Sequence, residues 1–124
     1  MEKMIQVIIC RPGKKAYTCQ ISNQLEIMQD IVDGYIECFR MPYDPKIIIV
    51  CNEEGKLKGM ENNRVIRNGA GQAIEIIAGT FLIVREGLDG EFASLNAQDL
   101  IRYMNLMDES VTMNFDDMIS LFIF

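Results

Sequence analysis

The middle of the chain carries a dense group of polar side chains that could bind an anionic ligand. Asn62, Asn63 and Arg64 follow one another, and Arg67 comes three residues later. A guanidinium presents five donors in a planar fork that suits phosphate or carboxylate. An asparagine amide both donates and accepts, which suits a base edge or a ribose. The pattern therefore indicates an anion-binding segment.

Neighbouring positions extend this candidate site. A glycine and a hydroxyl at Gly79 and Thr80 would let a ligand approach the backbone closely. The predicted ligand-binding residues are Asn52, Lys56, Asn63, Arg64, Arg67, Gly79 and Thr80. The alternative is structural: a turn held together by asparagine side chains, with Arg64 paired to Glu53 or Glu54. The sequence leaves both interpretations open.

The residue types argue against catalysis. The chain contains no histidine, so it lacks the imidazole base of Ser-His-Asp and Cys-His enzymes. Its four cysteines form no C-x-x-C pair, so no zinc site is expected. Glu53 and Glu54 are adjacent, and adjacent side chains on a strand point to opposite faces. We expect no catalytic residues, no metal and no cofactor, and we expect the cysteines to be reduced core residues in a cytoplasmic protein.

Charge narrows the class of partner. The formal net charge is −6, which argues against a general nucleic-acid surface. Residues 56–72 hold four basic side chains and one acid, a local charge of +3, and the remainder therefore carries −9. A basic patch on an acidic body favours a small anion over a long polyanion. No apolar run approaches the ~20 residues that cross a bilayer, so no membrane partner is expected.

The elements that must position these residues follow from periodicity and turn signals. Dense or alternating apolar runs predict strands at 4–10, 15–21, 35–41, 46–52, 74–77 and 80–84. Helical spacing predicts helices over 22–33 and 94–107. The order β-β-α-β-β-β-β-α predicts an α+β fold, a mostly antiparallel sheet of five to six strands with two helices.

Several local signals mark where these elements end. Ser22 or Asn23 is expected to cap the first helix, with Glu26 three residues after Asn23 as in a capping box, and Gly34 is expected to take the left-handed position after that helix. Asn96 or Ser94 is expected to cap the second helix. The glycine-rich stretch at 68–71 predicts a hairpin turn, and the break at Gly79 predicts a bulge or a close backbone approach.

The C-terminal residues differ from the rest of the chain. Residues 1–107 are expected to form one domain, and 108–124 are an extension that is first acidic and then apolar. Four apolar residues at the very end must pack on something. We expect Phe122 and Phe124 to be buried, either on the same domain or at an interface of a homo-oligomer.

The order of short motifs resembles a known family. "CNEEGKL" at 51–57, Asn63-Arg64, "IAGTF" at 77–81 and Ser94-Leu95 occur in an order similar to that of the domain-of-unknown-function 3846 family, over residues 4 to 107. The resemblance implies small proteins of bacteria, phages and mobile elements, where stand-alone domains often oppose host defence. It transfers no activity.

Together these observations predict a non-enzymatic protein of the bacterial cytoplasm that sequesters an anionic, nucleotide-derived immune signal. The absence of histidine, the local basic charge and the mobile-element context favour this function. The alternative is an anti-defence protein that inhibits a host enzyme by direct contact, resembling an anti-CRISPR protein, and the unusual tail favours that one.

Overall fold

The computed structural model describes residues 3–108, and all structural statements concern that range. Both predicted helices are present, and the described residues also form eight strands. In chain order the elements are β1 (Met4–Cys10), β2 (Tyr17–Ser22), α1 (Leu25–Val32), β3 (Ile36–Met41), β4 (Asp44–Asn52), β5 (Asn62–Arg67), β6 (Ala73–Ala78), β7 (Phe81–Glu86), β8 (Phe92–Ala93) and α2 (Ala97–Leu106). The predicted packing of Phe122 and Phe124 lies outside the described residues.

The strands form two sheets. A six-stranded sheet has the order β2-β1-β7-β4-β3, with β8 paired to β7, and β5 and β6 form a separate two-stranded sheet. All the pairings are antiparallel. The fold is therefore α+β, as the sequence predicts, with the sheet divided into two parts.

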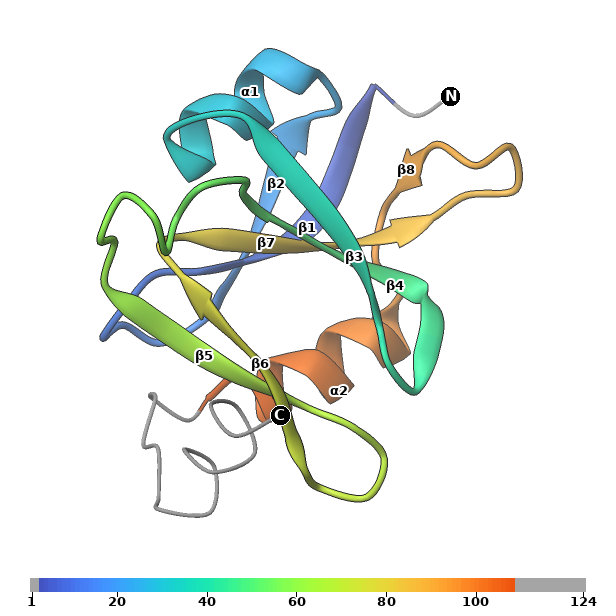
Figure 1. Ribbon diagram of the computed structural model, residues 1–124. Coiled ribbons are helices and arrows are strands. Elements are labelled where there is room, and N and C mark those ends of the chain that lie inside the picture. Colours follow the sequence, from blue (N-terminus) through green and yellow to red (C-terminus); the bar gives the residue numbers. More distant parts are fainter. Residues whose placement is uncertain (1–2, 109–124) are drawn as a thin grey trace.

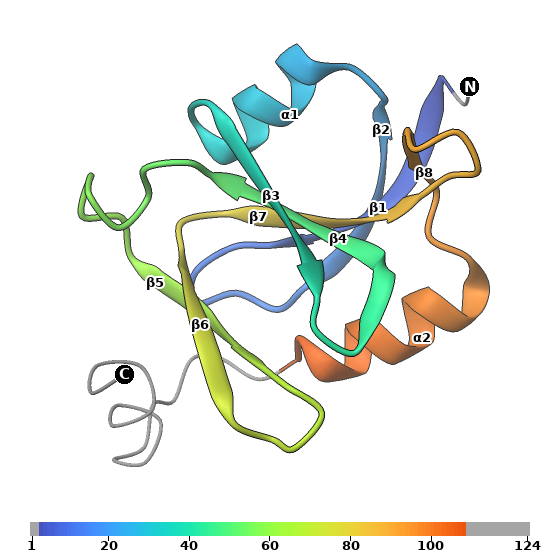
Figure 2. The same cartoon turned by 45° about the vertical axis from the view of Figure 1, so that its right-hand side comes forward.

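The large sheet separates two cores because successive strand residues point to opposite faces. Ile49 and Val50 are neighbours on β4, both are fully buried, and each lies in a different apolar cluster. One cluster lies under α1, which contributes Met28. The other lies under α2, β5 and β6, with Tyr103 and Ile66 among its members. Figures 1 and 2 show α1 on one side of the sheet and α2 with the β5–β6 hairpin on the other.

The sequence predicts neither the two-residue strand β8 nor the longer strand β5. Its residues are "NNRVIR", and asparagine is depleted in strands. It forms because Ile66 enters the core and because Asn63 and Arg64 find internal hydrogen-bond partners. Its pairing with β6 shifts register twice, between Asn62 and Arg64 and between Ile66 and Arg67.

The two helices differ in how well their ends were predicted. The capping box of α2 is confirmed, with Asn96 and Asp99 exchanging hydrogen bonds of 2.8 and 3.0 Å. The capping box at Asn23 is wrong, because the residue before α1 is Gln24 and its side chain caps nothing. The left-handed position after α1 belongs to Asp33, at φ 62°, and Gly34 follows it at φ 156°.

Candidate functional site

Arg64 lies inside the protein, at the centre of a buried polar cluster. The sequence places Arg64 outside every predicted strand and helix, yet it belongs to β5 and is 3% exposed. Its Nε donates to the Met107 carbonyl at 3.0 Å, and its Nη2 donates to the Lys14 carbonyl at 2.6 Å. Its Nη1 donates to Asn63 Oδ1 at 2.6 Å. Neither Glu53 nor Glu54 pairs with it, so the alternative interpretation of the sequence was also wrong about the partner.

Asn63 completes this cluster from the same strand. It is fully buried, and its amide nitrogen donates to the carbonyls of Cys10 at 2.9 Å and Gly79 at 2.8 Å. The two side chains thus tie β5 to the end of β1, to the turn after β6 and, through Met107, to the end of α2. Their donors are used in holding these segments together, so a ligand would have to break internal bonds to reach them.

The Cys10 thiol is buried within the electrostatic field of this cluster. Burial raises the pKa of Cys10 to about 12, against a smaller opposing effect of the Arg64 charge. The thiol therefore stays protonated near neutral pH and is a poor nucleophile. All four cysteines are free; Cys10 and Cys51 are buried as expected, whereas Cys19 is half-buried and Cys38 is exposed on β3.

Asn52 also makes hydrogen bonds within the protein. Its amide nitrogen donates to the carbonyls of Val32 and Asp33, both at 3.0 Å, and its Oδ1 accepts from the Glu54 amide at 2.8 Å. It therefore holds the end of α1 against the end of β4. A Cβ on Gly34 would lie 2.6 Å from the Asn52 amide nitrogen, so this junction leaves no room for a side chain.

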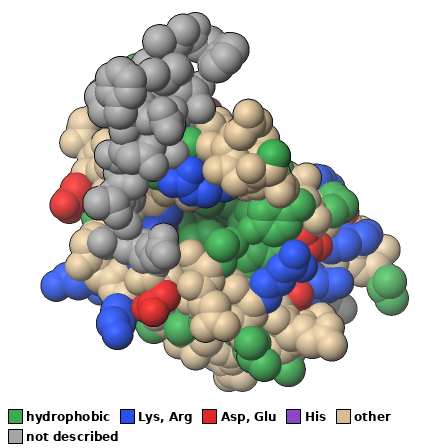
Figure 3. Space-filling model, turned by 90° about the horizontal axis from the view of Figure 1, so that it is seen from below, with side chains coloured by type: hydrophobic (Ala, Val, Ile, Leu, Met, Phe, Trp, Pro, Cys, Tyr) green, Lys and Arg blue, Asp and Glu red, His purple; other side chains and the backbone are tan. Residues whose placement is uncertain are grey.

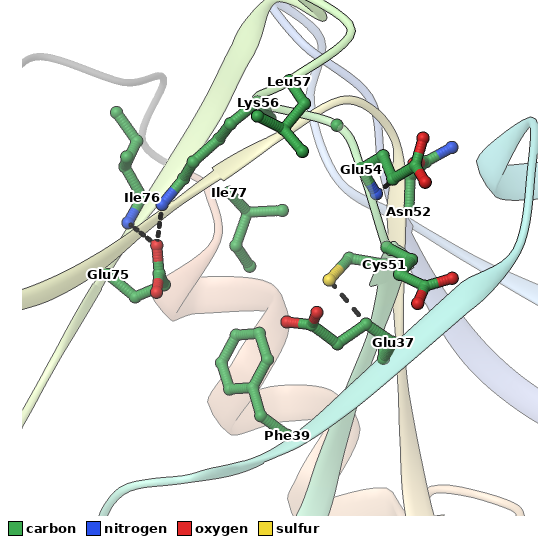
Figure 4. A pocket seen from close by; sticks show the side chains of 13 residues that line it. Glu37, Phe39, Cys51, Asn52, Glu54, Lys56, Leu57, Glu75, Ile76 and Ile77 are labelled. Atoms are coloured by element: carbon green, nitrogen blue, oxygen red, sulfur yellow. Dashed lines mark hydrogen bonds and ion pairs between the residues drawn. The ribbon is translucent and has the colours of Figure 1, made fainter.

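Lys56 stands at the mouth of a pocket that is acidic. Its ammonium pairs with Glu75. The pocket, of about 340 Å³, opens between β3 and β6 (Figure 4), and we call it the acidic pocket; its polar and aromatic lining includes Glu37, Phe39, Glu53, Glu54, Lys56 and Glu75. Four carboxylates against one lysine make it unsuitable for an anion, so the predicted role of Asn52 and Lys56 in anion binding finds no support in the charges around them.

Gly79 and Thr80 form the sharp connection from β6 in the small sheet to β7 in the large one. Gly79 has φ 83°, and a Cβ there would lie 2.7 Å from the sulfur of Met60. The expected close approach is therefore to the protein's own side chain. Thr80 is half-buried beside it.

Arg67 is the predicted residue that lies at a groove of suitable charge. This groove, of about 710 Å³, lies between the turn that joins β5 to β6 and the last turn of α2. We call it the basic groove; it is lined by Tyr43, Arg67, Asn68, Gly69, Gly71, Arg102, Asn105 and Leu106. Among the described residues of its lining, two are arginines and none is a carboxylate. Figure 3 shows the molecule from below, the side on which the β5–β6 turn and α2 lie in Figure 1; basic and acidic side chains border a hydrophobic hollow there.

Arg102 is held in place by aromatic rings. Its guanidinium carbon lies 5.4 Å from the centre of the Tyr43 ring and 5.7 Å from that of Tyr103. Tyr103 is fully buried, and its hydroxyl donates to Asp44 Oδ2 at 2.8 Å. The same carboxylate oxygen is 3.7 Å from Arg102 Nη1. The guanidinium is thus oriented before any ligand arrives, yet its side chain stays 59% exposed.

The opposite wall of the basic groove is a fixed turn. Asn68 Oδ1 accepts from the amides of Ala70 and Gln72, both at 3.0 Å. Arg67 donates to the Gly71 carbonyl at 3.2 Å, which draws its head toward this turn. The predicted hairpin turn at 68–71 is confirmed. Arg102 was missed because nothing in the sequence links it to Arg67, 35 positions earlier.

Residues 3–108 contain neither a group of metal ligands nor a helix that could span a membrane. No three His, Cys, Asp or Glu side chains of this range are grouped closely enough to hold a metal ion. In the same range, neither helix has the length and apolar character needed to cross a membrane.

Comparison with known proteins gives one match. The family model described as "Domain of unknown function (DUF3846)" matches residues 5–108, nearly the whole of the described range. No curated protein and no solved structure matches the chain. The site must therefore be interpreted from its own geometry.

Proposed function

The chain belongs to the DUF3846 family, and we propose that it binds a small anionic, nucleotide-derived molecule in the basic groove, without catalysis. The observation that carries this proposal is the presence of Arg67 and Arg102 in the lining of the groove, whose described residues include no carboxylate; Asp44, behind Arg102, lies outside the lining. A volume of about 710 Å³ lies within the common range of small-molecule sites.

The groove offers separate groups for the charged and neutral parts of such a ligand. The two guanidinium groups would take phosphate oxygens through charge-assisted hydrogen bonds. Arg102 needs little reorganisation because two rings already hold it. The exposed amide of Asn105 has both a donor and an acceptor for a base edge.

Sequestration, rather than turnover, fits these groups. The chain has no histidine, and the described residues of the groove include no nucleophile beside a base. In a phage or mobile element, a protein of this kind would lower the free concentration of a nucleotide signal in the bacterial cytoplasm and so blunt a defence response.

Calorimetric titration with a panel of mononucleotides, cyclic dinucleotides and inorganic phosphate tests the proposal. We expect saturable binding of at least one nucleotide, and a stabilisation of about 2.7 kcal/mol when its concentration is 100 times its Kd. Arg67→Ala and Arg102→Ala should each weaken binding about ten- to a hundredfold. Arg11→Ala is the matched control. The guanidinium carbon of Arg11 also lies over a tyrosine ring, 5.6 Å from the centre of the Tyr17 ring, but Arg11 does not line the groove.

No binding across the panel, or wild-type affinity in Arg102→Ala, would overturn this proposal.

The second candidate function, inhibition of a host defence enzyme by direct contact, is favoured by exposed apolar side chains of α2. Ile101 and Leu106 on α2 are 67% and 48% exposed. Inhibition of a purified defence nuclease at a 1:1 ratio, lost in Ile101→Asp, would support it.

A further inference from the structure

The acidic pocket lies between two strand edges, and one of them is open. Strand β3 is the last strand of the large sheet, and β6 is paired on one side only, to β5. Residues of both strands line the pocket, with Glu37 and Phe39 from β3 facing Glu75 and Ile77 from β6 (Figure 4). An edge strand presents backbone N–H and C=O groups to any extended chain that reaches it.

The edge of β6 is blocked by the protein's own side chains. The Ile76 amide donates to its neighbour Glu75 at 3.0 Å, and Lys56 pairs with the same carboxylate. This arrangement covers an outward-facing amide of the strand, a common way to protect a sheet edge.

No side chain of residues 3–108 covers the edge of β3 in this way. Among the described residues, the side chain that bonds to its backbone is that of Cys51, whose thiol lies 3.7 Å from the Glu37 carbonyl. Cys51 belongs to β4, the strand that β3 already pairs with. The outward-facing side of this six-residue strand is therefore available for pairing.

The charges beside this edge define its partner. Glu37, Glu53 and Glu54 are exposed and make no side-chain ion pair among the described residues. Because no three of the described acidic side chains are close enough to share a metal ion, they suit cations that are spread along a chain. Alternate side chains of an added strand would point into the pocket, where Phe39 and Ile77 would contact the aliphatic stems of lysines.

We propose that the free edge of β3 pairs with an extended, basic segment of a partner protein, whose alternate lysine or arginine side chains enter the acidic pocket. Backbone hydrogen bonds would supply affinity, and the carboxylates would select basic over acidic segments. The basic groove takes no part, so this surface is independent of the proposed ligand binding.

An acetylated and amidated hexapeptide of alternating valine and lysine is a suitable probe. Titrated into isotope-labelled protein, it should bind saturably and shift the amide resonances of residues 36–41 and 53–56. The same peptide with glutamate in place of lysine should not bind. The Glu37→Gln and Glu54→Gln double variant should weaken binding about three- to tenfold. Glu26→Gln with Asp30→Asn, two exposed carboxylates of α1, should leave it unchanged.

Two N-methylated peptides decide whether the contact is strand pairing. In an antiparallel pair alternate residues point their N–H groups at the partner. N-methylation of one alternate set should therefore abolish binding, whereas methylation of the other set should be tolerated. Equal binding of both methylated peptides would show a purely electrostatic contact and overturn the proposal, as would shifts that map away from β3 or no saturation.

Discussion

Two arginines three positions apart on one strand have opposite roles. Arg64 is 3% exposed and donates to carbonyls of two other segments, the turn that joins β1 to β2 and the end of α2. Arg67 lies at the rim of the basic groove, opposite Arg102. Side chains at i and i+3 on a regular strand point to opposite faces, and the head of Arg67 donates to the Gly71 carbonyl of the β5–β6 turn. A basic residue in a polar stretch of the sequence is therefore not always part of a basic surface, because its side chain can be buried.

Replacing the buried arginine, Arg64, should have the largest effect on stability. Arg64→Ala would leave the carbonyls of Lys14 and Met107 without their donor, and each unsatisfied buried group costs about 1–3 kcal/mol. We expect a loss of at least about 3 kcal/mol in the free energy of unfolding, measured by urea denaturation. Arg11→Ala should change it by less than about 1 kcal/mol. Equal stability of the two variants would show that the buried cluster contributes little.

Lysine substitutions should separate the two arginines next. Arg64→Lys has three donors on one nitrogen and cannot reach carbonyls that lie in three directions, so about 2 kcal/mol of the loss should remain. Arg102→Lys keeps the charge at an exposed position, so unfolding should be unchanged while nucleotide affinity falls about fivefold. The measurement is the same denaturation with calorimetry alongside. If Arg102→Lys is the less stable variant, the assignment of roles is reversed.

These residues also show what the sequence could predict. Apolar periodicity predicted the α+β class, both helices and most strands, because core faces leave a regular pattern. It could not predict β5, since "NNRVIR" forms a strand only when tertiary partners satisfy Asn63 and Arg64. The basic groove was half predicted: Arg67 was in the candidate set, but Tyr43 and Arg102 join it through long-range packing. Counting charge along the chain also treated Lys56 as free, although Glu75 pairs with it.

Helix α2 connects the two regions, so weakening its start should affect both by a smaller amount. Its Met107 end accepts from Arg64, and its middle carries Arg102. Asn96→Ala removes the cap bond to the Asp99 amide, which is worth about 1 kcal/mol. We expect that loss in denaturation, together with a less than threefold fall in nucleotide affinity. Gln98→Ala, an exposed change in the first turn of the same helix, is the control. A loss of affinity greater than that of Arg102→Ala would mean that the helix end, and not the arginine, determines binding.

The smallest effect concerns the pH dependence of the buried cluster. Burial raises the pKa of Cys10 from 9.0 to about 12, so between these values the unfolded chain has released a proton that the folded protein retains. The unfolded state then binds fewer protons, and stability falls as the pH rises through 9 toward 12. Between pH 8 and pH 9 this one thiol should account for about 0.3–0.4 kcal/mol of the fall. Cys10→Ala should therefore lose less stability over that interval than the wild type, in matched urea denaturations at the two pH values.

The Cys10 carbonyl accepts from Asn63, and its thiol lies within the field of Arg64. The difference in pH dependence therefore measures how far water is excluded from the buried cluster. An identical pH dependence in the two proteins would mean that water reaches the thiol, and the contrast between a sealed Arg64 and an open Arg102 would then be weaker than the structure indicates.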